Sequence, residues 1–179
     1  MSGRRAEAQR MLDALLELAR IASVMVDGEE AKRIITDRAH YYLANPDTGY
    51  RFLSSDYYDV DGETFLRMKK TLLRLSMLVG FPCDTSLWVR VKGLEDHVTV
   101  AVQNGNMKRY WEWAEEKRAL EPEMAQCMEK GEVTVAPPDP NRGLVTVLAP
   151  VSDSLGDVVG FVELTAKDPR STASGPDWS

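Results

Sequence analysis

Apolar residues in the first part of the chain recur at three- and four-residue steps, which is the spacing of one face of an α-helix. Between residues 11 and 35 the apolar positions in step are Leu12, Leu15, Leu16, Ala19, Ala22, Val26, Ile34 and Ile35. The spacing predicts a long amphipathic N-terminal helix. Asp27-Gly28 interrupts it, and glycine costs about 1 kcal/mol relative to alanine within a helix. We therefore expect a kink or a division into two helices there.

A second helix follows a segment rich in turn formers between residues 40 and 62. Its apolar positions are Phe65, Met68, Leu72, Leu75 and Val79, again at three- and four-residue steps. Gly80 and Pro82 then provide a helix stop. This is the clearest helical pattern in the chain.

The period changes to two from Thr85 onward, which is typical of half-buried strands. Leu87, Val89 and Val91 alternate with Trp88 and Arg90. The alternation resumes at Val98, Val100 and Val102 after a turn at residues 92–96. The pattern predicts two antiparallel strands joined by a short loop.

Helical patterns interrupt the strands before the alternation returns. Residues 110–120 form a polar helical stretch, and Pro122 opens a short helix that stops at Gly131. Three more strands are predicted at residues 133–135, 144–151 and 158–164, the last two as a hairpin. The prediction is an α+β fold, with a five-stranded antiparallel sheet, a long N-terminal helix and a helical insertion between strands two and three.

The length of 179 residues fits one domain with a substantial core, which we place at residues 1–166. Residues 167–179 are rich in Ser, Pro, Gly and Asp and are expected to form a disordered tail or linker. No stretch approaches the roughly 20 apolar residues of a membrane span, and the polar N-terminus lacks a signal peptide's apolar segment. Two origins fit this pattern: a stand-alone cytosolic protein, or the soluble part of a membrane receptor whose spans are absent from this chain.

Charge and motifs exclude several classes of function. The net charge is −6, without a cluster of basic and aromatic residues, so nucleic acid is not an expected partner. No phosphate loop, nucleophile elbow or metal-spaced cluster is present, and His40 and His97 stand apart. We predict no catalytic residue, no metal and no cofactor. Cys83 and Cys127 are expected to be buried free thiols, with an oxidised pair as the alternative in an extracytoplasmic domain.

The hairpin carries the most specific motif, Leu148-Ala149-Pro150-Val151-Ser152-Asp153-Ser154-Leu155-Gly156-Asp157-Val158-Val159-Gly160. It resembles the corresponding hairpin of PAS-like sensor domains of the Cache (PDC) type, which lie outside the membrane in bacterial histidine kinases, cyclases and chemoreceptors. Gly156 closes the turn, and Gly160 permits close backbone packing. The segment Ala22 to Gly28 is similar to that family's "alanine, apolar pair, Asp-Gly" at the end of its long helix.

The resemblance implies a ligand on one face of the sheet, covered by the segment between strands two and three, here residues 103–128. The residues that it implies as ligand contacts are Arg109, Tyr110, Trp111, Trp113 and Trp88. An arginine beside aromatic rings suits a small carboxylate. The alternative is that Trp111 and Trp113 pack on the sheet as core residues while Arg109 is solvated.

One branch of that family binds amino acids with an Arg-x-Trp-Tyr element and an acidic residue late in the last strand. Arg109 and Trp111 match the element, but Glu112 replaces its tyrosine and Thr165 stands at the acidic position. The resemblance therefore does not favour ordinary α-amino acids, while a plain carboxylate or a neutral ligand stays open.

These expectations lead to a small-molecule-sensing domain that signals through its N-terminal helix in a homodimer. Its location would be extracytoplasmic (periplasmic) in a receptor, or otherwise cytoplasmic. The alternative function is a stand-alone cytosolic adaptor that binds a protein partner and holds no small molecule. An enzyme of unrecognised type is a third alternative, for which no set of catalytic residues can be proposed.

Overall fold

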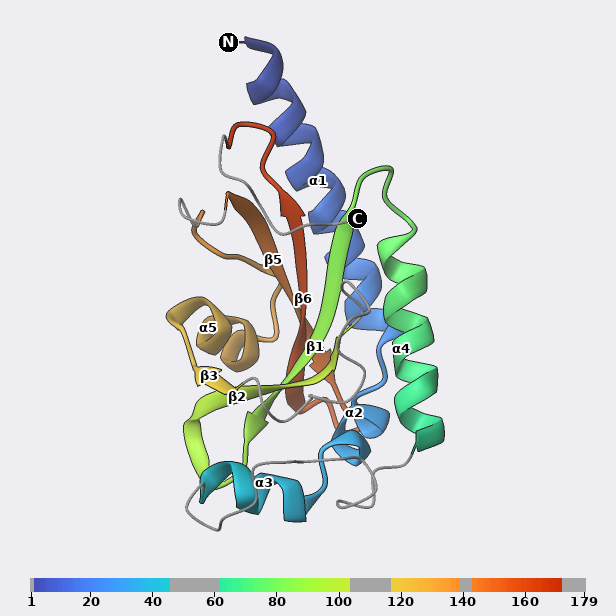
Figure 1. Cartoon of the computed structure of the whole chain (residues 1–179), viewed down its shortest axis with the longest axis vertical. Helices are drawn as coiled ribbons and strands as arrows, with labels where there is room; N and C mark the ends of the chain where they lie inside the picture. The colour runs from blue at the N-terminus through green and yellow to red at the C-terminus, as the bar shows by residue number, and fades with distance from the viewer. Residues whose placement is uncertain (1, 46–61, 104–116, 139–142, 172–179) are drawn as a thin grey trace.

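The computed structural model describes residues 2–45, 62–103, 117–138 and 143–171. Within these ranges four helices precede three strands, and a fifth helix separates these from the last three strands (Figure 1). The helices are α1 (Ser2–Met25), α2 (Gly28–Ile34), α3 (Asp37–Ala44), α4 (Gly62–Ser76) and α5 (Pro122–Lys130). The strands are β1 (Cys83–Val91), β2 (Leu94–Gln103), β3 (Lys117–Ala119), β4 (Thr134–Val135), β5 (Leu144–Ser152) and β6 (Val158–Lys167).

All neighbouring strands are antiparallel, in the order β3-β2-β1-β6-β5-β4. The α+β prediction is confirmed, but the sheet has six strands where the sequence predicted five. The additional strand is β3, which falls in the stretch predicted to be helical; there Ala119 pairs with His97 and Lys117 with Thr99. Three mostly polar residues carry no measurable period, so the pairing with β2, and not local propensity, makes this segment a strand.

The predicted N-terminal helix is divided in two, as Asp27-Gly28 indicated, and α1 begins well before the predicted start at residue 11. The Asp27 carboxylate caps α2 by accepting a hydrogen bond of 2.8 Å from the Glu29 N–H. Among the described residues no helix is both long enough and apolar enough to cross a membrane.

Gly28 lies against the end of the β5–β6 hairpin. A Cβ atom at this position would lie 2.4 Å from the Ser152 carbonyl oxygen, a distance that no side chain tolerates. The hairpin turn is also tied to α2, since Lys32 Nζ lies 2.9 Å from an Asp153 carboxylate oxygen and the Ser154 hydroxyl donates to Glu29 over 2.9 Å. The two segments that carried the family resemblance are therefore packed together in the fold.

Apolar residues cover both faces of the sheet. Leu15, Leu18 and Ala19 of α1 and Met68 and Leu72 of α4 are fully buried on one face. On the other face α5 covers a smaller cluster, which includes Trp88, Val98, Met124, Leu148 and Phe161. Figure 1 shows α1 and α4 on one side of the strands and α5 on the other. The apolar stripe of the N-terminal helix is thus used against the protein's own sheet.

Cys83 and Cys127 are buried free thiols, as predicted. Cys83 packs in the cluster under α1 and α4, whereas Cys127 packs in the cluster under α5. Because the sheet separates the two sulfur atoms, a disulfide within one chain would require the fold to open. Burial raises the pKa of each thiol to about 12, which keeps both in the neutral form.

The described chain continues beyond residue 166, where we placed the end of the domain. Lys167 ends β6, and the Asp168 N–H donates to the Gly143 carbonyl over 2.8 Å. The buried Asp168 carboxylate binds the Arg170 guanidinium, with a shortest distance of 2.7 Å. Residues 172–179 of the predicted tail lie outside the described residues.

Candidate ligand-binding site

A pocket of about 330 Å³ lies on the α5 side of the sheet. Its polar wall consists of Arg118, Glu121, Glu123, Thr146, Glu163 and Thr165. Its apolar wall consists of Met124, Ala136, Pro137, Leu144 and Leu148. The walls come from β3, the start of α5, the segment after β4, and the strands β5 and β6. The pocket therefore depends on elements that are far apart in the sequence.

The alternation of β6 explains why polar side chains face this pocket. Val162, Leu164 and Ala166 are buried against α1 and α4. The residues between them, Glu163 and Thr165, must then point to the opposite face. Antiparallel pairing places Thr146 beside Thr165 and Leu148 beside Glu163 on that same face.

Arg118 and Glu163 form an ion pair at the centre of the pocket's polar wall. Arg118 Nη2 donates to Glu163 Oε2, and the two side chains are only 28% and 14% exposed. The guanidinium also lies 4.0 Å from the centroid of the Trp88 ring, which is a cation–π distance. The Nε atom of Arg118 is buried and has no hydrogen-bond partner in the described part of the chain. Arg118 is thus held from two directions by residues of β1 and β6.

Trp88, one of the predicted ligand contacts, is 4% exposed and forms part of the floor beneath Arg118. Its Nε1–H donates to the Ser86 hydroxyl over 2.9 Å, which fixes the ring on the α5 side of β1. It packs in the apolar cluster and is not among the residues that line the pocket. Arg109, Tyr110, Trp111 and Trp113 lie outside the described residues, so their role as ligand contacts stays a prediction.

Sequence reasoning missed the main charged residues of the pocket. Glu163 had a usable signal, because a glutamate and a threonine interrupt an apolar strand at alternate positions. The resemblance drew attention only to Thr165, which does line the pocket, two residues further along the same face. Arg118 had no such signal, since its strand was not predicted.

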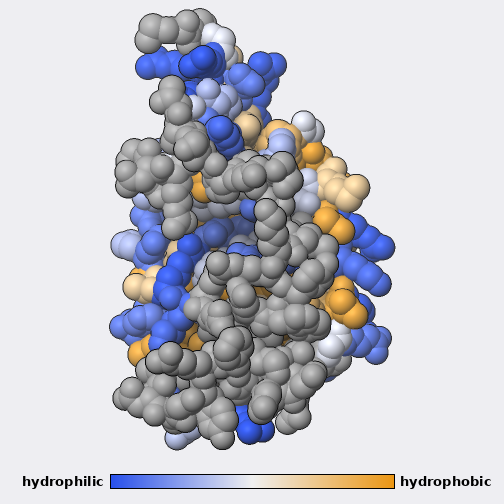
Figure 2. Space-filling view, in the orientation of Figure 1, coloured by the Kyte–Doolittle hydropathy of each residue, from blue (hydrophilic) through white to orange (hydrophobic). Residues whose placement is uncertain are grey.

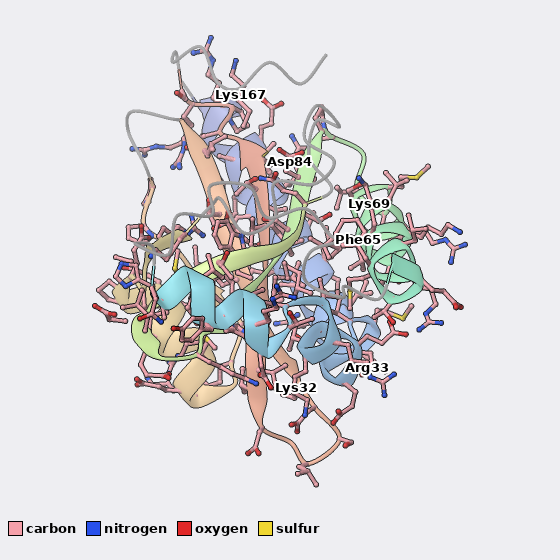
Figure 3. The ribbon with its side chains drawn as sticks, turned by 60° about the horizontal axis from the view of Figure 1, so that its bottom comes forward. Lys32, Arg33, Phe65, Lys69, Asp84 and Lys167 are labelled. Atoms are coloured by element: carbon pink, nitrogen blue, oxygen red, sulfur yellow. The ribbon has the colours of Figure 1, made fainter. Side chains whose placement is uncertain are left out.

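Asp84 lies next to the polar side chains of the pocket, because it is the cross-strand partner of Thr165. Figure 3 shows Asp84 at the start of β1, near the end of β6 that carries Lys167. Burial raises the pKa of the Asp84 carboxyl to about 6. At neutral pH this half-buried carboxyl group is therefore ionised, and its ionisation lowers the free energy of unfolding.

Replacing Asp84 by asparagine is expected to stabilise the protein by about 1 kcal/mol at pH 8, after allowance for the part of the side chain that water reaches. The folded-state pKa of about 6 lies above the ordinary value of 3.8, so ionisation weakens folding as pH rises through this window. At pH 4 the carboxyl is neutral and the gain should vanish. Thermal unfolding at both pH values measures the difference, with Asp157→Asn, an exposed aspartate, as the control. An equal gain at pH 4 and pH 8 would contradict this account.

The two histidines have structural environments. His40 is buried, its Nδ1 accepts a hydrogen bond of 3.2 Å from the Lys92 N–H, and burial lowers its pKa to about 4. His97 Nδ1 lies 2.9 Å from an Asp96 carboxylate oxygen. In the described part of the chain, no group of three or more His, Cys, Asp or Glu side chains could hold a metal ion.

Comparison with known proteins gives a similarity to solved structures and no sequence match. No family's sequence model matches the chain, and no curated protein matches it. Among solved structures, the chain is similar to the GAF domain of A. aeolicus nlh2 in an inactive state, at 12% identity and a TM-score of 0.39. The alignment covers 73% of this chain and 78% of that one. The pairing of the strands defines the fold, and the resemblance to Cache domains stays a prediction.

Proposed function

We propose that the chain is a small-molecule-binding sensor domain whose ligand occupies the pocket between α5 and the sheet. The observation that carries the proposal is the pocket itself, which combines charged, hydroxyl and apolar walls in about 330 Å³. A solid interior at this place would have favoured an adaptor without a ligand. The proposed role is binding, with no chemical step.

The position of the pocket offers a route for a signal. Strands β5 and β6 line the pocket on one face, and α1 packs on the same two strands from the other face. A ligand that shifts these strands would move α1 directly, because closely packed layers transmit displacements. We propose α1 as the output element, in a bacterial signal-transduction protein of the histidine kinase, cyclase or chemoreceptor type, with the domain outside the cytoplasm.

The apolar stripe of α1, which suggested that two N-terminal helices pair in a dimer, has a different role in the structure. Leu15, Ala19 and Ala22, which suggested a pairing face, are buried within the protein. In the proposed mechanism the signal therefore leaves through the position of α1, and this stripe does not meet a second copy.

The alternative function, an adaptor that binds a protein partner, would use a different surface. Leu66, Leu73, Met77 and Leu78 along α4 and the turn that follows it are 45–74% exposed. Figure 2 shows apolar side chains among hydrophilic ones at the edge of the molecule where α4 lies. Apolar residues scattered among charged ones are ordinary for a protein surface, so the pocket supports the sensor better than this surface supports the adaptor.

A thermal-shift screen of small amines, carboxylates and purines tests the proposed function. A compound at 100 times its Kd should stabilise the protein by about 2.7 kcal/mol. Thr146→Trp fills the pocket from β5 and should abolish the shift, whereas Leu155→Trp, at the exposed tip of the hairpin, should retain it. The proposal is wrong if no compound of any class acts, or if hits act equally on the filled variant.

A further inference from the structure

The pocket carries more negative than positive charge. Among the described residues three glutamates, Glu121, Glu123 and Glu163, line it together with a single arginine, Arg118, so the formal charge of this described lining is −2. The start of α5 adds about half a positive charge through its backbone dipoles. That contribution is too small to reverse the sign. A ligand entering this space meets a net negative wall.

Arg118, the one cation among the described lining residues, is already held in an ion pair. Arg118 donates to Glu163 through Nη2 and stacks on the Trp88 ring, and its Nε atom is buried without a hydrogen-bond partner among the described residues. A ligand carboxylate that bound Arg118 would therefore lie beside the Glu163 carboxylate, which already binds the same guanidinium. Like charges at such a distance repel strongly where water is scarce.

Hydrogen-bond acceptors, by contrast, are free on the pocket face. Glu163 uses Oε2 for Arg118, while its Oε1 has no hydrogen-bond partner among the described residues. The hydroxyl groups of Thr146 and Thr165 are likewise without a partner in the described part of the chain. The nearby Asp84 adds a further carboxyl to the row. These acceptor oxygens and carboxyl groups suit a ligand that carries both N–H donors and a positive charge.

We infer that the pocket takes a small organic cation with N–H donors, an amine or a guanidinium compound, on an apolar body. The cation binds Glu163 Oε1 with help from the threonine hydroxyls, and the body lies on Met124, Leu144 and Leu148. The inference rests on the proposed function and names its ligand class. The expectation of a carboxylate came from Arg109, which lies outside the described residues.

Benzylamine, benzyl alcohol and benzoate test the charge preference, because they share a ring and differ in the head group. Calorimetric titration at pH 7 should give benzylamine the highest affinity and benzoate the lowest. Glu163→Gln should weaken benzylamine binding by about tenfold or more, since a hydrogen bond to a charged group is lost. Glu132→Gln, which removes an exposed glutamate outside the pocket, should leave the affinity unchanged.

Arg118→Met should change the affinity for benzylamine in the opposite direction, because it retains Glu163, the residue proposed to bind the cation. It frees both oxygens of Glu163, so benzylamine should bind several-fold more tightly and stabilise this variant more than the wild type. Benzoate binding that is lost in Arg118→Met and blocked by Thr146→Trp would overturn the inference and leave the proposed function standing. Failure of all three compounds and of the wider screen would overturn both.

Discussion

Replacing Gly160 by alanine is expected to lower the free energy of unfolding by about 3 kcal/mol or more. A Cβ atom at residue 160 would lie 2.3 Å from the Trp88 carbonyl oxygen and 3.2 Å from a Val89 side-chain carbon. The first of these atoms is backbone in the central strand β1, so it cannot move aside as the end of a side chain can. The two strands must separate, and their hydrogen bonds must weaken.

Urea unfolding of Gly160→Ala and of Gly62→Ala measures this effect. Gly62 begins α4, and a Cβ atom there would meet nothing within 4 Å, so its replacement should be neutral or slightly stabilising. Gly160→Ala should also weaken ligand binding, because β6 carries Glu163 and Thr165 into the pocket. A loss of stability below about 1 kcal/mol would show that the strands adjust to each other, and the packing argument would fail.

The sequence predicted this glycine's role because the hairpin is local. The strands β5 and β6 and the turn at Gly156 lie within 24 residues, and each has its own period or turn former. The hairpin motif also indicated a need for close packing at Gly160, but the atoms that it approaches belong to β1, outside the hairpin. The break between helices at Asp27-Gly28 and the helix stop at Gly131 were predictable for the same reason. The contact of Gly28 with Ser152 was not, because it joins segments that only the completed fold brings together.

The site was less predictable than the fold. The side of the sheet proposed to bind a ligand was inferred from a resemblance, and Arg118, Glu121 and Met124 of the segment 103–128 line the pocket. Its charged centre joins β3 to β6 across two intervening strands. Periodicity shows which residues share a face, but it does not show which rows of different strands lie side by side. The strand order and register decide that, and they are set by the whole sheet.

The ion pair at this centre is expected to couple strongly in a double-mutant cycle. Glu163→Ala alone should lower the free energy of unfolding by about 2–3 kcal/mol, because it leaves the largely buried guanidinium of Arg118 without its anion. Arg118→Ala alone should cost a similar amount, partly through the lost contact with Trp88. The double variant removes both charges and should recover about 1–2 kcal/mol of the summed loss.

Arg20 and Glu17 form the matched control, since their side chains are 70% and 64% exposed and their ion pair spans 3.1 Å on α1. Their coupling should stay below about 0.5 kcal/mol. The size of the Arg118–Glu163 coupling bears directly on the ligand, because a strong pair keeps Arg118 unavailable to anions and leaves a negative wall. A coupling as small as that of the control would mean that Arg118 is free to bind a carboxylate, and the preference for an organic cation would lose its main support.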